Sequence, residues 1–356
     1  MVEKCQGSTA RLCSHVPGNS AQTTKSTQAK IAEFAGVSVS TVSYAFSGRR
    51  KIAPKTRQKV LDAAAQLGYS LPSSAYENRA RKHIIAVSAP IHSYSSLNGY
   101  SAFFFETLSG IRASGSDLLL FASEADELER IARNDLADGV ILLDVKRNDP
   151  RAFTAEHLSL PVVSIGVPVN VECKKVFSTD LDFKRAAEIT IQHAAESGLM
   201  NILVLGDREQ AYKDGSNYLF RFKKYLGRYA LEFGIAVNFA YSPKKIMDIA
   251  EVLEAELTKF PETDALVINS AAEVVPIAFN YLSHRKGMKP LPMLSVGSYG
   301  NLPNQGCMID EIPFEPHRAV SLAMRAISRQ MNGDISMCGK SEMIEPRYLD
   351  RGTFKK

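Results

Sequence analysis

Residues 27–72 have the sequence TQAKIAEFAGVSVSTVSYAFSGRRKIAPKTRQKVLDAAAQLGYSLP, and this stretch determines the fold of the N-terminal part of the chain. Its apolar residues recur at helical spacing in three short segments. The first segment predicts a helix from about Gln28 to Ala35, with Thr27 as its N-cap. Gly36 breaks this helix, because glycine adopts the backbone angles that a tight turn requires.

Two further helices are predicted at short intervals. Ser38 is the expected N-cap of the second helix, and Gly48 ends it. Its inward-facing residues are Val42, Ala45 and Phe46. The third helix begins after Pro54, a residue favoured in the first helical turn, and ends at Gly68. Its buried face is expected to hold Val60, Leu61, Ala64 and Leu67. A helix, a three-residue turn, a second helix and a supporting third one form a DNA-binding helix-turn-helix.

The outward face of the second helix distinguishes this motif from an ordinary small helical bundle. It is polar and compact, being formed by Ser40, Thr41, Ser43, Tyr44 and Ser47. Hydroxyl groups bond to phosphate oxygens, and side chains at the groove floor contact base edges. The pattern therefore favours insertion of this helix into the major groove of DNA.

Charge is divided unevenly along the chain. The whole carries a formal net charge of +5, yet residues 27–82 hold ten Lys and Arg against three acidic residues, which is +7. A basic N-terminal segment on a mildly acidic body is typical of a nucleic-acid-binding module joined to a part with another task. A charge run can also be a solvated face, but its coincidence with the helical motif favours DNA contact.

Length and composition limit the remaining choices. A chain of 356 residues suits two or three domains, and its 45% apolar content allows a sizeable core. No apolar run is long enough to span a bilayer, and residues 1–26 lack the apolar region of a secretory signal. We expect these residues to be a disordered tail. The five scattered cysteines favour reduced thiols over a disulfide framework or a zinc site, and we expect no cofactor and no metal.

The stretch quoted above closely resembles the N-terminal domain of LacI/GalR-type bacterial regulators. The resemblance is ungapped over about 45 residues, and the AGVSVSTVS core with the KTRxKVLxAAxxLGY ending is highly specific. It implies that base edges are contacted by Val39, Ser40 and Tyr44. It implies phosphate contacts for Thr27, Ser38, Thr41, Ser43, Ser47 and Thr56. From their place in the following loop, we also assign phosphate contacts to Arg49, Arg50 and Lys51.

Two departures from the family concern DNA sequence and shape. Many members have Arg where this chain has Tyr44, so the operator sequence does not follow from relatives. In the expected hinge segment, residues 73–82, Ala75 is kept, but Asn78 replaces the leucine that normally intercalates. Tyr76, Asn78 and Arg79 either contact the minor groove or belong to a solvated linker. Kinking of the operator is therefore not implied.

From His83 onward, short apolar runs alternate with helical stretches such as Phe103–Ser114 and Glu124–Arg133. The runs are Ile84–Val87, Leu118–Phe121, Gly139–Leu143, Val162–Ile165, Ile202–Leu205, Ala236–Tyr241, Ala265–Asn269 and Met293–Val296. Buried strands alternating with helices predict α/β layers with parallel sheets.

Two sets of strands predict two lobes around a cleft within an effector-binding and dimerisation core, residues 83–356. We expect the lobes to be joined near Thr179 and Pro303. Lobe 1 is then about 83–178 plus 305–336, and lobe 2 about 179–304 plus 337–356. The motifs DLADGVILL, STDLDFKRAAE and the ending YLDRGT resemble the family's periplasmic-binding-protein-like core.

The resemblance places an effector in the cleft of such a hinged protein. It implies wall positions for Ser88, His92, Phe104, Asp144, Asp180, Arg221, Ser270 and Tyr299. Arg221 either grips a ligand or forms a surface ion pair. The segments Val296–Tyr299 and Ser270–Ala271 lack two carboxylates that the family uses, which argues against a standard monosaccharide pocket. Tyr299 offers a stacking face instead.

These observations predict a cytoplasmic, nucleoid-associated transcriptional regulator, and not an enzyme, because no catalytic motif is present. The expected partners are double-stranded operator DNA and a second copy of the chain, as a homodimer or a tetramer, with no membrane. We expect a repressor that answers to a carbohydrate-like effector. The alternative is a regulator without a small-molecule effector, or one controlled by a protein partner.

Overall fold

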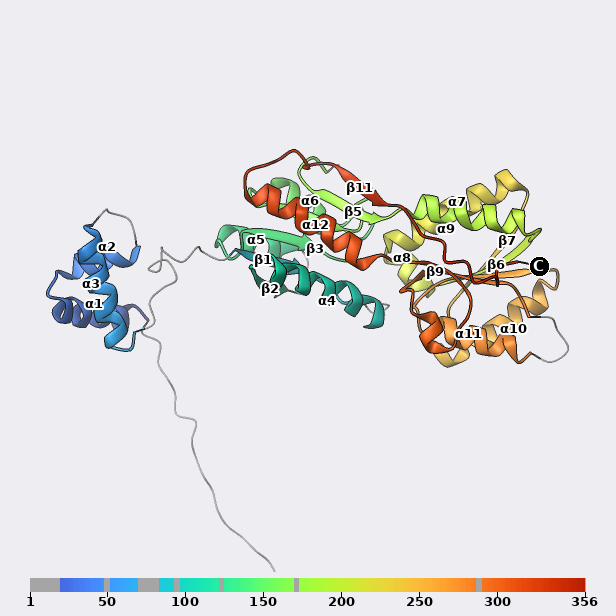
Figure 1. Cartoon of the computed structure of the whole chain (residues 1–356), viewed down its shortest axis with the longest axis horizontal. Coiled ribbons are helices and arrows are strands. Elements are labelled where there is room, and N and C mark those ends of the chain that lie inside the picture. The colour runs from blue at the N-terminus through green and yellow to red at the C-terminus, as the bar shows by residue number, and fades with distance from the viewer. Residues whose placement is uncertain are drawn as a thin grey trace, which may run out of the picture. The chain divides into compact units, whose positions relative to one another are not determined.

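The computed structural model describes residues 20–47, 52–69, 83–92, 97–121, 125–169, 173–285 and 290–355 (Figure 1). The chain divides into two compact units, one within residues 1–81 and the other within residues 82–356. Each unit has a buried apolar core of its own, and each is described separately below.

Three helices form the N-terminal unit: α1 (Ser20–Ala35), α2 (Val39–Ser47) and α3 (Pro54–Gln66). All three pack against one another around a small apolar core. The buried residues are Ile31, Ala32, Ala35, Val42, Ala45, Val60, Ala63 and Ala64. The predicted turn between the first two helices is confirmed, with Gly36 at a φ of 58°. The fold class expected from the sequence is therefore present in this unit.

Two details of this unit differ from the prediction. The helix α1 begins at Ser20, so Thr27 lies inside it and is not its N-cap. Residues 20–26 contain no glycine or proline, so nothing in them stops the helix from extending toward the N-terminus. The tail prediction is therefore wrong for residues 20–26, and residues 1–19 lie outside the described part. Leu67, expected inside, is 36% exposed because it follows the last turn of α3.

Two parallel sheets form the second unit, as the alternation of runs predicts. The first has the strand order β11-β5-β4-β3-β1-β2. Its strands are β1 (Ile84–Ser88), β2 (Asp117–Phe121), β3 (Gly139–Leu142), β4 (Val162–Ile165), β5 (Phe177–Leu181) and β11 (Ser341–Ile344). The second has the order β10-β9-β8-β6-β7. Its strands are β6 (Asn201–Gly206), β7 (Ala236–Tyr241), β8 (Ala265–Asn269), β9 (Met293–Ser298) and β10 (Asp310–Pro313).

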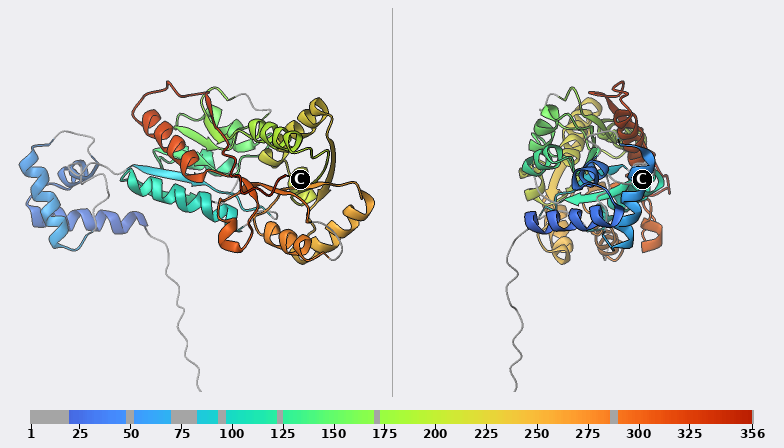
Figure 2. Two further views of the ribbon diagram at one scale, coloured as in Figure 1. Left: turned by 45° about the vertical axis from the view of Figure 1, so that its right-hand side comes forward. Right: turned by 90° about the vertical axis from the view of Figure 1, so that its left-hand side faces the viewer.

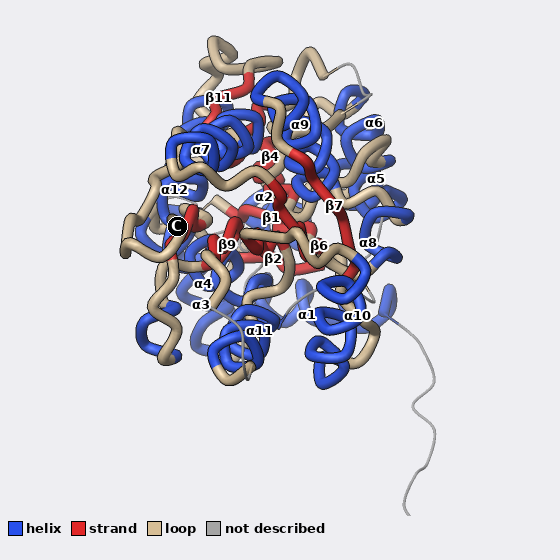
Figure 3. The backbone as a smooth tube through the Cα atoms, turned by 90° about the vertical axis from the view of Figure 1, so that its right-hand side faces the viewer, coloured by secondary structure: helices blue, strands red, loops and turns tan. Residues whose placement is uncertain are grey.

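Helices cover both faces of each sheet (Figures 1 and 3). In the first lobe α4 packs against α12 on one face, and α5 packs against α6 on the other. These helices are α4 (Leu97–Ala113), α5 (Ala125–Arg133), α6 (Pro150–His157) and α12 (Pro316–Met331). In the second lobe α7 packs against α9, and α10 against α11 across the sheet from them. The elements are α7 (Phe183–Glu196), α8 (Glu209–Lys213), α9 (Asn217–Phe233), α10 (Ile249–Lys259), α11 (Val274–Ser283), η2 (Ile246–Asp248) and η3 (Leu302–Gln305).

The chain passes between the two sheets three times, after β5, after β10 and after β11 (Figure 2). The predicted join near Thr179 lies close to the passage after β5, whereas the join near Pro303 is wrong in position because that passage follows β10, and the passage after β11 was not predicted. β10 belongs to the second lobe although residues 305–336 were assigned to the first, and β11 belongs to the first lobe although residues 337–356 were assigned to the second. Both strands are short and carry acidic residues, so their sequences lack the apolar run by which buried strands are recognised.

The C-terminal YLDRGT segment is hydrogen-bonded to β10. Asp310 accepts hydrogen bonds from the Tyr348 hydroxyl at 2.6 Å, from the Arg351 amide at 2.9 Å and from the Thr353 amide at 3.0 Å. Arg351 also lies 2.7 Å from Glu311, which is fully buried. These contacts explain how a strand with two acidic residues can lie in the core, since buried charges need partners.

Candidate functional site

The first candidate site is the N-terminal end of α2 in the N-terminal unit. The Ser38 hydroxyl oxygen accepts a hydrogen bond from the Thr41 amide at 3.2 Å, which confirms Ser38 as the N-cap. The same oxygen lies 2.8 Å from the hydroxyls of Ser40 and Thr41. The cap leaves a cluster of hydroxyl groups at the positive end of the helix dipole, where an anion such as phosphate is favoured.

The exposed face of α2 carries the residues that the resemblance assigns to base edges. Val39 is 46% exposed although it is apolar, and Ser40 is also exposed. Tyr44 is half-buried, whereas Val42 and Ala45 on the opposite face are fully buried. An exposed valine beside hydroxyl groups suits a groove floor, because it offers apolar contact to a thymine methyl.

The remaining predicted DNA contacts divide into described and undescribed residues. Thr41, Ser43 and Thr27 are half-buried, and Thr56 is half-buried in the first turn of α3. Outside the described residues lie the side chain of Ser47, Arg49, Arg50 and Lys51, together with the hinge residues Ala75, Tyr76, Asn78 and Arg79.

The second candidate site is a pocket between the two lobes of the second unit, with a cavity volume of about 140 Å³. Its lining comes from the carboxyl ends of strands in both sheets and from α4 and α9. The residues are Gly99, Tyr100, Phe103, Leu143, Asp144, Val145, Ile165, Gly166, Asp180, Asp207, Asn217, Tyr218, Ser270, Ala271, Ala272, Gly297, Tyr299 and Phe314. Ligands of open α/β sheets bind at such strand ends.

Aromatic rings form one wall of this pocket, centred on Phe314. Its ring centroid lies 5.7 Å from that of Phe103, 5.5 Å from Tyr218 and 5.6 Å from Tyr299. Phe314 directly follows β10, at one of the passages between the lobes. Opposite it, Gly297 has a φ of 87°, and a Cβ there would lie 3.0 Å from the Phe314 ring. Glycine at this position therefore lets the ring enter the pocket wall.

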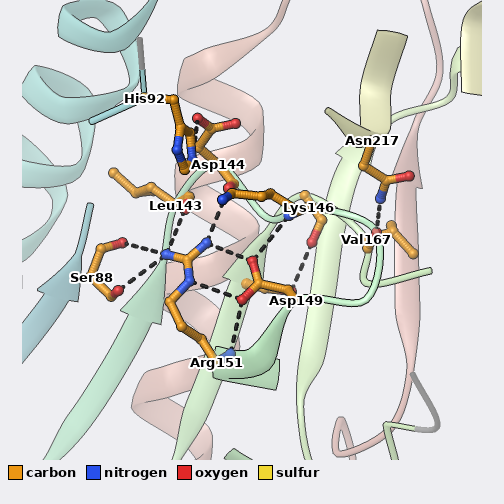
Figure 4. A network of polar contacts seen from close by, with 11 residues as sticks. Ser88, His92, Leu143, Asp144, Lys146, Asp149, Arg151, Val167 and Asn217 are labelled. Carbon is orange, nitrogen blue, oxygen red and sulfur yellow. Dashed lines mark hydrogen bonds and ion pairs between the residues drawn. The ribbon is translucent and has the colours of Figure 1, made fainter. Parts of the chain in front are cut away.

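A buried arginine fixes the loop that carries Asp144 (Figure 4). Arg151 is 2% exposed and pairs with Asp149, with Nη2 2.7 Å from the Asp149 Oδ2 atom. Its guanidinium also donates to the Ser88 hydroxyl oxygen at 3.1 Å and to the carbonyls of Leu143 and Asp144, each at 3.0 Å. Asp144 has a φ of 50°, an unusual value for a residue with a side chain. The network holds this conformation and turns the Asp144 carboxyl toward the pocket and His92.

Three carboxyl groups line the pocket: Asp144, Asp180 and Asp207. Burial raises the pKa of all three, because a charged carboxylate loses solvation in a confined site. At Asp180 the neighbouring Arg221 opposes this effect, and at Asp144 the neighbouring His92 does. Burial also raises the pKa of the Tyr100 hydroxyl to about 12.

Direct contacts join the two lobes beside the pocket. Arg221 on α9 places Nη1 2.7 Å from the Asp180 Oδ2 atom on β5. The Arg147 amide donates to the Gly215 carbonyl at 2.9 Å, and the Arg147 guanidinium lies 4.0 Å from the centre of the Phe220 ring. The Asn217 side-chain amide also donates to the Val167 carbonyl. These polar contacts, together with the packing of Phe103 on α4 against Phe314 after β10, join the two lobes in the arrangement described here.

Half of the predicted effector residues line the pocket and half do not. Asp144, Asp180, Ser270 and Tyr299 line it. Ser88 is fully buried and bonded to Arg151, so its predicted place on the wall is wrong. Phe104 packs edge-on against Phe105, and its neighbour Phe103 lines the pocket instead. His92 and Arg221 lie behind the wall, beside Asp144 and Asp180 respectively.

Several lining residues were not expected from the sequence, among them Tyr100, Phe103, Asp207, Asn217, Tyr218 and Phe314. One of them carried a visible signal, since Asp207 directly follows β6 and the ends of parallel strands meet at one edge. Asp207 also supplies a carboxyl group in a pocket that was expected to lack two. Phe314 carried no such signal, because the strand before it was not recognised.

Neither a metal cluster nor a membrane span is found in the part of the chain that the structure describes. No group of three or more His, Cys, Asp or Glu side chains there could hold a metal ion. Likewise, none of the described helices is both long enough and apolar enough to cross a membrane.

Known proteins resemble both units. Residues 29–72 match the model described as "Bacterial regulatory proteins, lacI family". The chain is 24% identical over 272 residues to the HTH-type transcriptional regulator CelR of Thermobifida fusca, which covers 67% of this chain and 79% of that protein. It is 33% identical over 155 residues to the HTH-type transcriptional regulator GntR of Pseudomonas aeruginosa, which covers 41% of this chain and 43% of that protein.

Solved structures agree in fold. A lac repressor dimer bound to operator and the anti-inducer ONPF has a TM-score of 0.65 at 16% identity, over 92% of this chain and 98% of that chain. A complex of the transcriptional regulator CelR with cellobiose has a TM-score of 0.59 at 20% identity, over 92% of this chain and 99% of that chain. The helix-turn-helix and the two-lobed core define a DNA-binding transcriptional regulator. More particularly, its N-terminal domain is that of the LacI family, and over two thirds of its length the chain is similar to a relative named as an HTH-type transcriptional regulator.

Proposed function

We propose that this regulator is a repressor, which binds a near-palindromic operator as a homodimer and is released by a small, carbohydrate-like effector in the interlobe pocket. Two copies would place their α2 helices in successive major grooves, roughly ten base pairs or a multiple of that apart. The observation that carries the proposal is that one pocket receives walls from both lobes of a hinged core.

At the DNA surface, the proposal assigns base contacts to Val39, Ser40 and Tyr44 and phosphate contacts to Ser38 and Thr41. The capped N-terminus of α2 supports this assignment, because its hydroxyl cluster and exposed valine lie on one face. The phosphate contacts would fix the position of the helix, and the base contacts would discriminate between operators.

At the pocket, the proposal requires that the effector binds two lobe arrangements with different affinity, since a ligand without this difference shifts no equilibrium. The interlobe contacts support it, because they would break or tighten when the lobes move. The related fold that was solved with cellobiose supports a sugar-sized ligand. Asp180 and Tyr299 would bond to and stack on such a ligand.

The proposal is tested by selecting bound sequences from random DNA and repeating the selection with single metabolites. We expect enrichment of a near-palindrome that one class of small polar metabolite abolishes. Enrichment that no metabolite changes would support a regulator without a small-molecule effector, and enrichment of single half-sites would contradict the homodimer.

A further inference from the structure

The interlobe pocket is lined by acidic but not by basic side chains. Asp144, Asp180 and Asp207 face it, and none of the described lining residues is Lys, Arg or His. Glu273 adds to the negative charge, because its field is felt at both Asp207 and Tyr299. The burial that raises the pKa of these carboxyl groups reflects the cost of a charge without a close partner, and a cationic ligand would offset this cost and favour the ionised carboxylates.

The basic groups behind the wall are engaged elsewhere or lie at a distance. Arg221 pairs with Asp180, and Arg151 pairs with Asp149. His92 lies 3.6 Å from Asp144, and burial lowers the pKa of this histidine, which makes it a weaker cationic neighbour than an arginine. The Arg208 Nε atom is 3.9 Å from the Asp207 carboxyl, at the outer limit of an ion pair. Asp144 and Asp207 therefore have more distant cationic neighbours than Asp180, whose partner Arg221 lies 2.7 Å away.

The aromatic wall of the pocket also favours a positively charged ligand. The same pocket that holds the three carboxyl groups is also lined by Tyr100, Phe103, Tyr218, Tyr299 and Phe314. The face of an aromatic ring is electron-rich and attracts a cation within about 6 Å of its centroid, and the attraction is larger where water is excluded. Carboxyl groups and ring faces together make a site for a cation attached to an apolar skeleton.

Buried acceptor atoms complete the pattern. The side-chain amide nitrogen of Asn217 donates a hydrogen bond to the Val167 carbonyl, and that of Asn269 donates to the Val296 carbonyl. Their carbonyl oxygens Oδ1 have no hydrogen-bond partner in the described structure. Asn217 lines the pocket, and Asn269 precedes the lining residue Ser270. A ligand rich in hydrogen-bond donors would match such walls, since unmatched buried acceptors cost free energy.

We infer that the effector carries a protonated amine or amidinium group on a ring-sized, partly apolar skeleton, with the charged group between Asp144 and Asp207 and the ring against the aromatic wall. This inference rests on the proposed function in one respect, namely that the pocket receives the effector. It narrows the ligand class: anionic compounds such as sugar acids and sugar phosphates are excluded, and amine-bearing compounds are preferred over neutral analogues.

The test uses the full-length protein and two series of compounds that differ mainly in charge. The first is glucosamine, glucose and gluconate, and the second is tyramine, tyrosol and 4-hydroxyphenylacetate. Binding is measured by calorimetry and by the shift of the melting temperature. Each compound is also added to the protein bound to its selected operator. The variants are Asp207→Asn and Asp144→Asn, with Glu209→Gln as a matched control, because Glu209 is an exposed carboxylate paired with Lys213 outside the pocket.

We expect the amine to bind roughly tenfold or more tightly than its neutral analogue, as a charge-assisted contact predicts, and the acid not to bind. Either pocket variant should reduce this preference, and Glu209→Gln should keep it. Two pocket variants are used so that one that fails to fold leaves the other. The inference is overturned if a neutral or acidic member binds as tightly as its amine, or if neither amine binds.

The readouts separate this inference from the proposed function. An amine that binds in the pocket without changing operator affinity keeps the charge preference and contradicts the effector role. Release of the operator by glucose, with no preference for glucosamine, supports the effector role and overturns the charge preference.

Discussion

Arg221 on α9 of the second lobe lies 2.7 Å from Asp180 on β5 of the first lobe, and the two side chains are 13% and 12% exposed. The ion pair therefore joins two elements that belong to different sheets. Its position behind the pocket wall links occupancy of the pocket to the arrangement of the lobes, because Asp180 also lines the pocket.

Replacing one partner of this ion pair should lower the free energy of unfolding more than replacing both partners. We expect Arg221→Ala to lower the free energy of unfolding by about 3 kcal/mol, since it leaves a buried carboxylate without its partner. The double variant Arg221→Ala with Asp180→Asn should recover part of this loss. The measurement is equilibrium unfolding in urea. Equal stability of the single and double variants would show that the pair carries no coupling.

The hydrogen bonds between Asp310 and the C-terminal segment should make the free energy of unfolding depend on pH. Burial opposes ionisation of Asp310, but hydrogen bonds from Tyr348, Thr353 and Arg351 outweigh it and lower the pKa of the Asp310 carboxyl. A carboxyl whose pKa is lower in the folded state stabilises the fold above its unfolded pKa. That stability is lost as the pH falls through the folded pKa.

We therefore expect the free energy of unfolding to fall below about pH 5, and to fall less steeply in Asp310→Asn than in the unchanged protein. Urea unfolding at a series of pH values checks this. Asp334→Asn is a suitable control, because the pKa of Asp334 is also lowered, by hydrogen bonds from Ser336, but this residue is exposed. If Asp310→Asn and the unchanged protein show the same slope, the hydrogen bonds to the C-terminal segment do not contribute to acid stability.

Replacing Tyr44 should change which DNA is bound more than how tightly DNA is bound in general. We expect Tyr44→Ala to lose about 1–3 kcal/mol of discrimination at one operator position, as for other base contacts. Lys55→Gln, at an exposed residue in the first turn of α3, should instead weaken binding to all sequences and reduce the salt dependence. Binding assays on selected and scrambled DNA at several salt concentrations separate the two effects. An unchanged preference in Tyr44→Ala would remove this residue from the base-contacting set.

The parts of the fold that follow from sequence are those with local causes. The N-cap at Ser38 and the turn at Gly36 are visible as single residues, and Ile202–Leu205 is visible as an apolar run. In contrast, β10 carries the buried residues Asp310 and Glu311, whose partners lie about 40 positions further along the chain. No local sequence pattern identifies such a strand, and the predicted lobe boundary before β10 was therefore misplaced.

The pocket residues also divide into those that the sequence predicts and those that depend on long-range packing. Asp144 and Asp180 were expected from the resemblance and line it, whereas Phe314 enters it only because β10 joins the second sheet. Arg221 was left open between a ligand contact and an ion pair, and the structure shows the ion pair with Asp180. Which atoms reach a cavity depends on packing between lobes, which a single sequence does not display.

Selection of bound sequences from random double-stranded DNA tests the central claim most directly. The full-length protein should enrich a near-palindrome with half-sites about one helical turn apart, and Tyr44→Ala should blur one position in each half. Recovery of DNA without any enriched sequence, at a salt concentration that suppresses non-specific binding, would contradict the claim that this chain is a sequence-specific regulator.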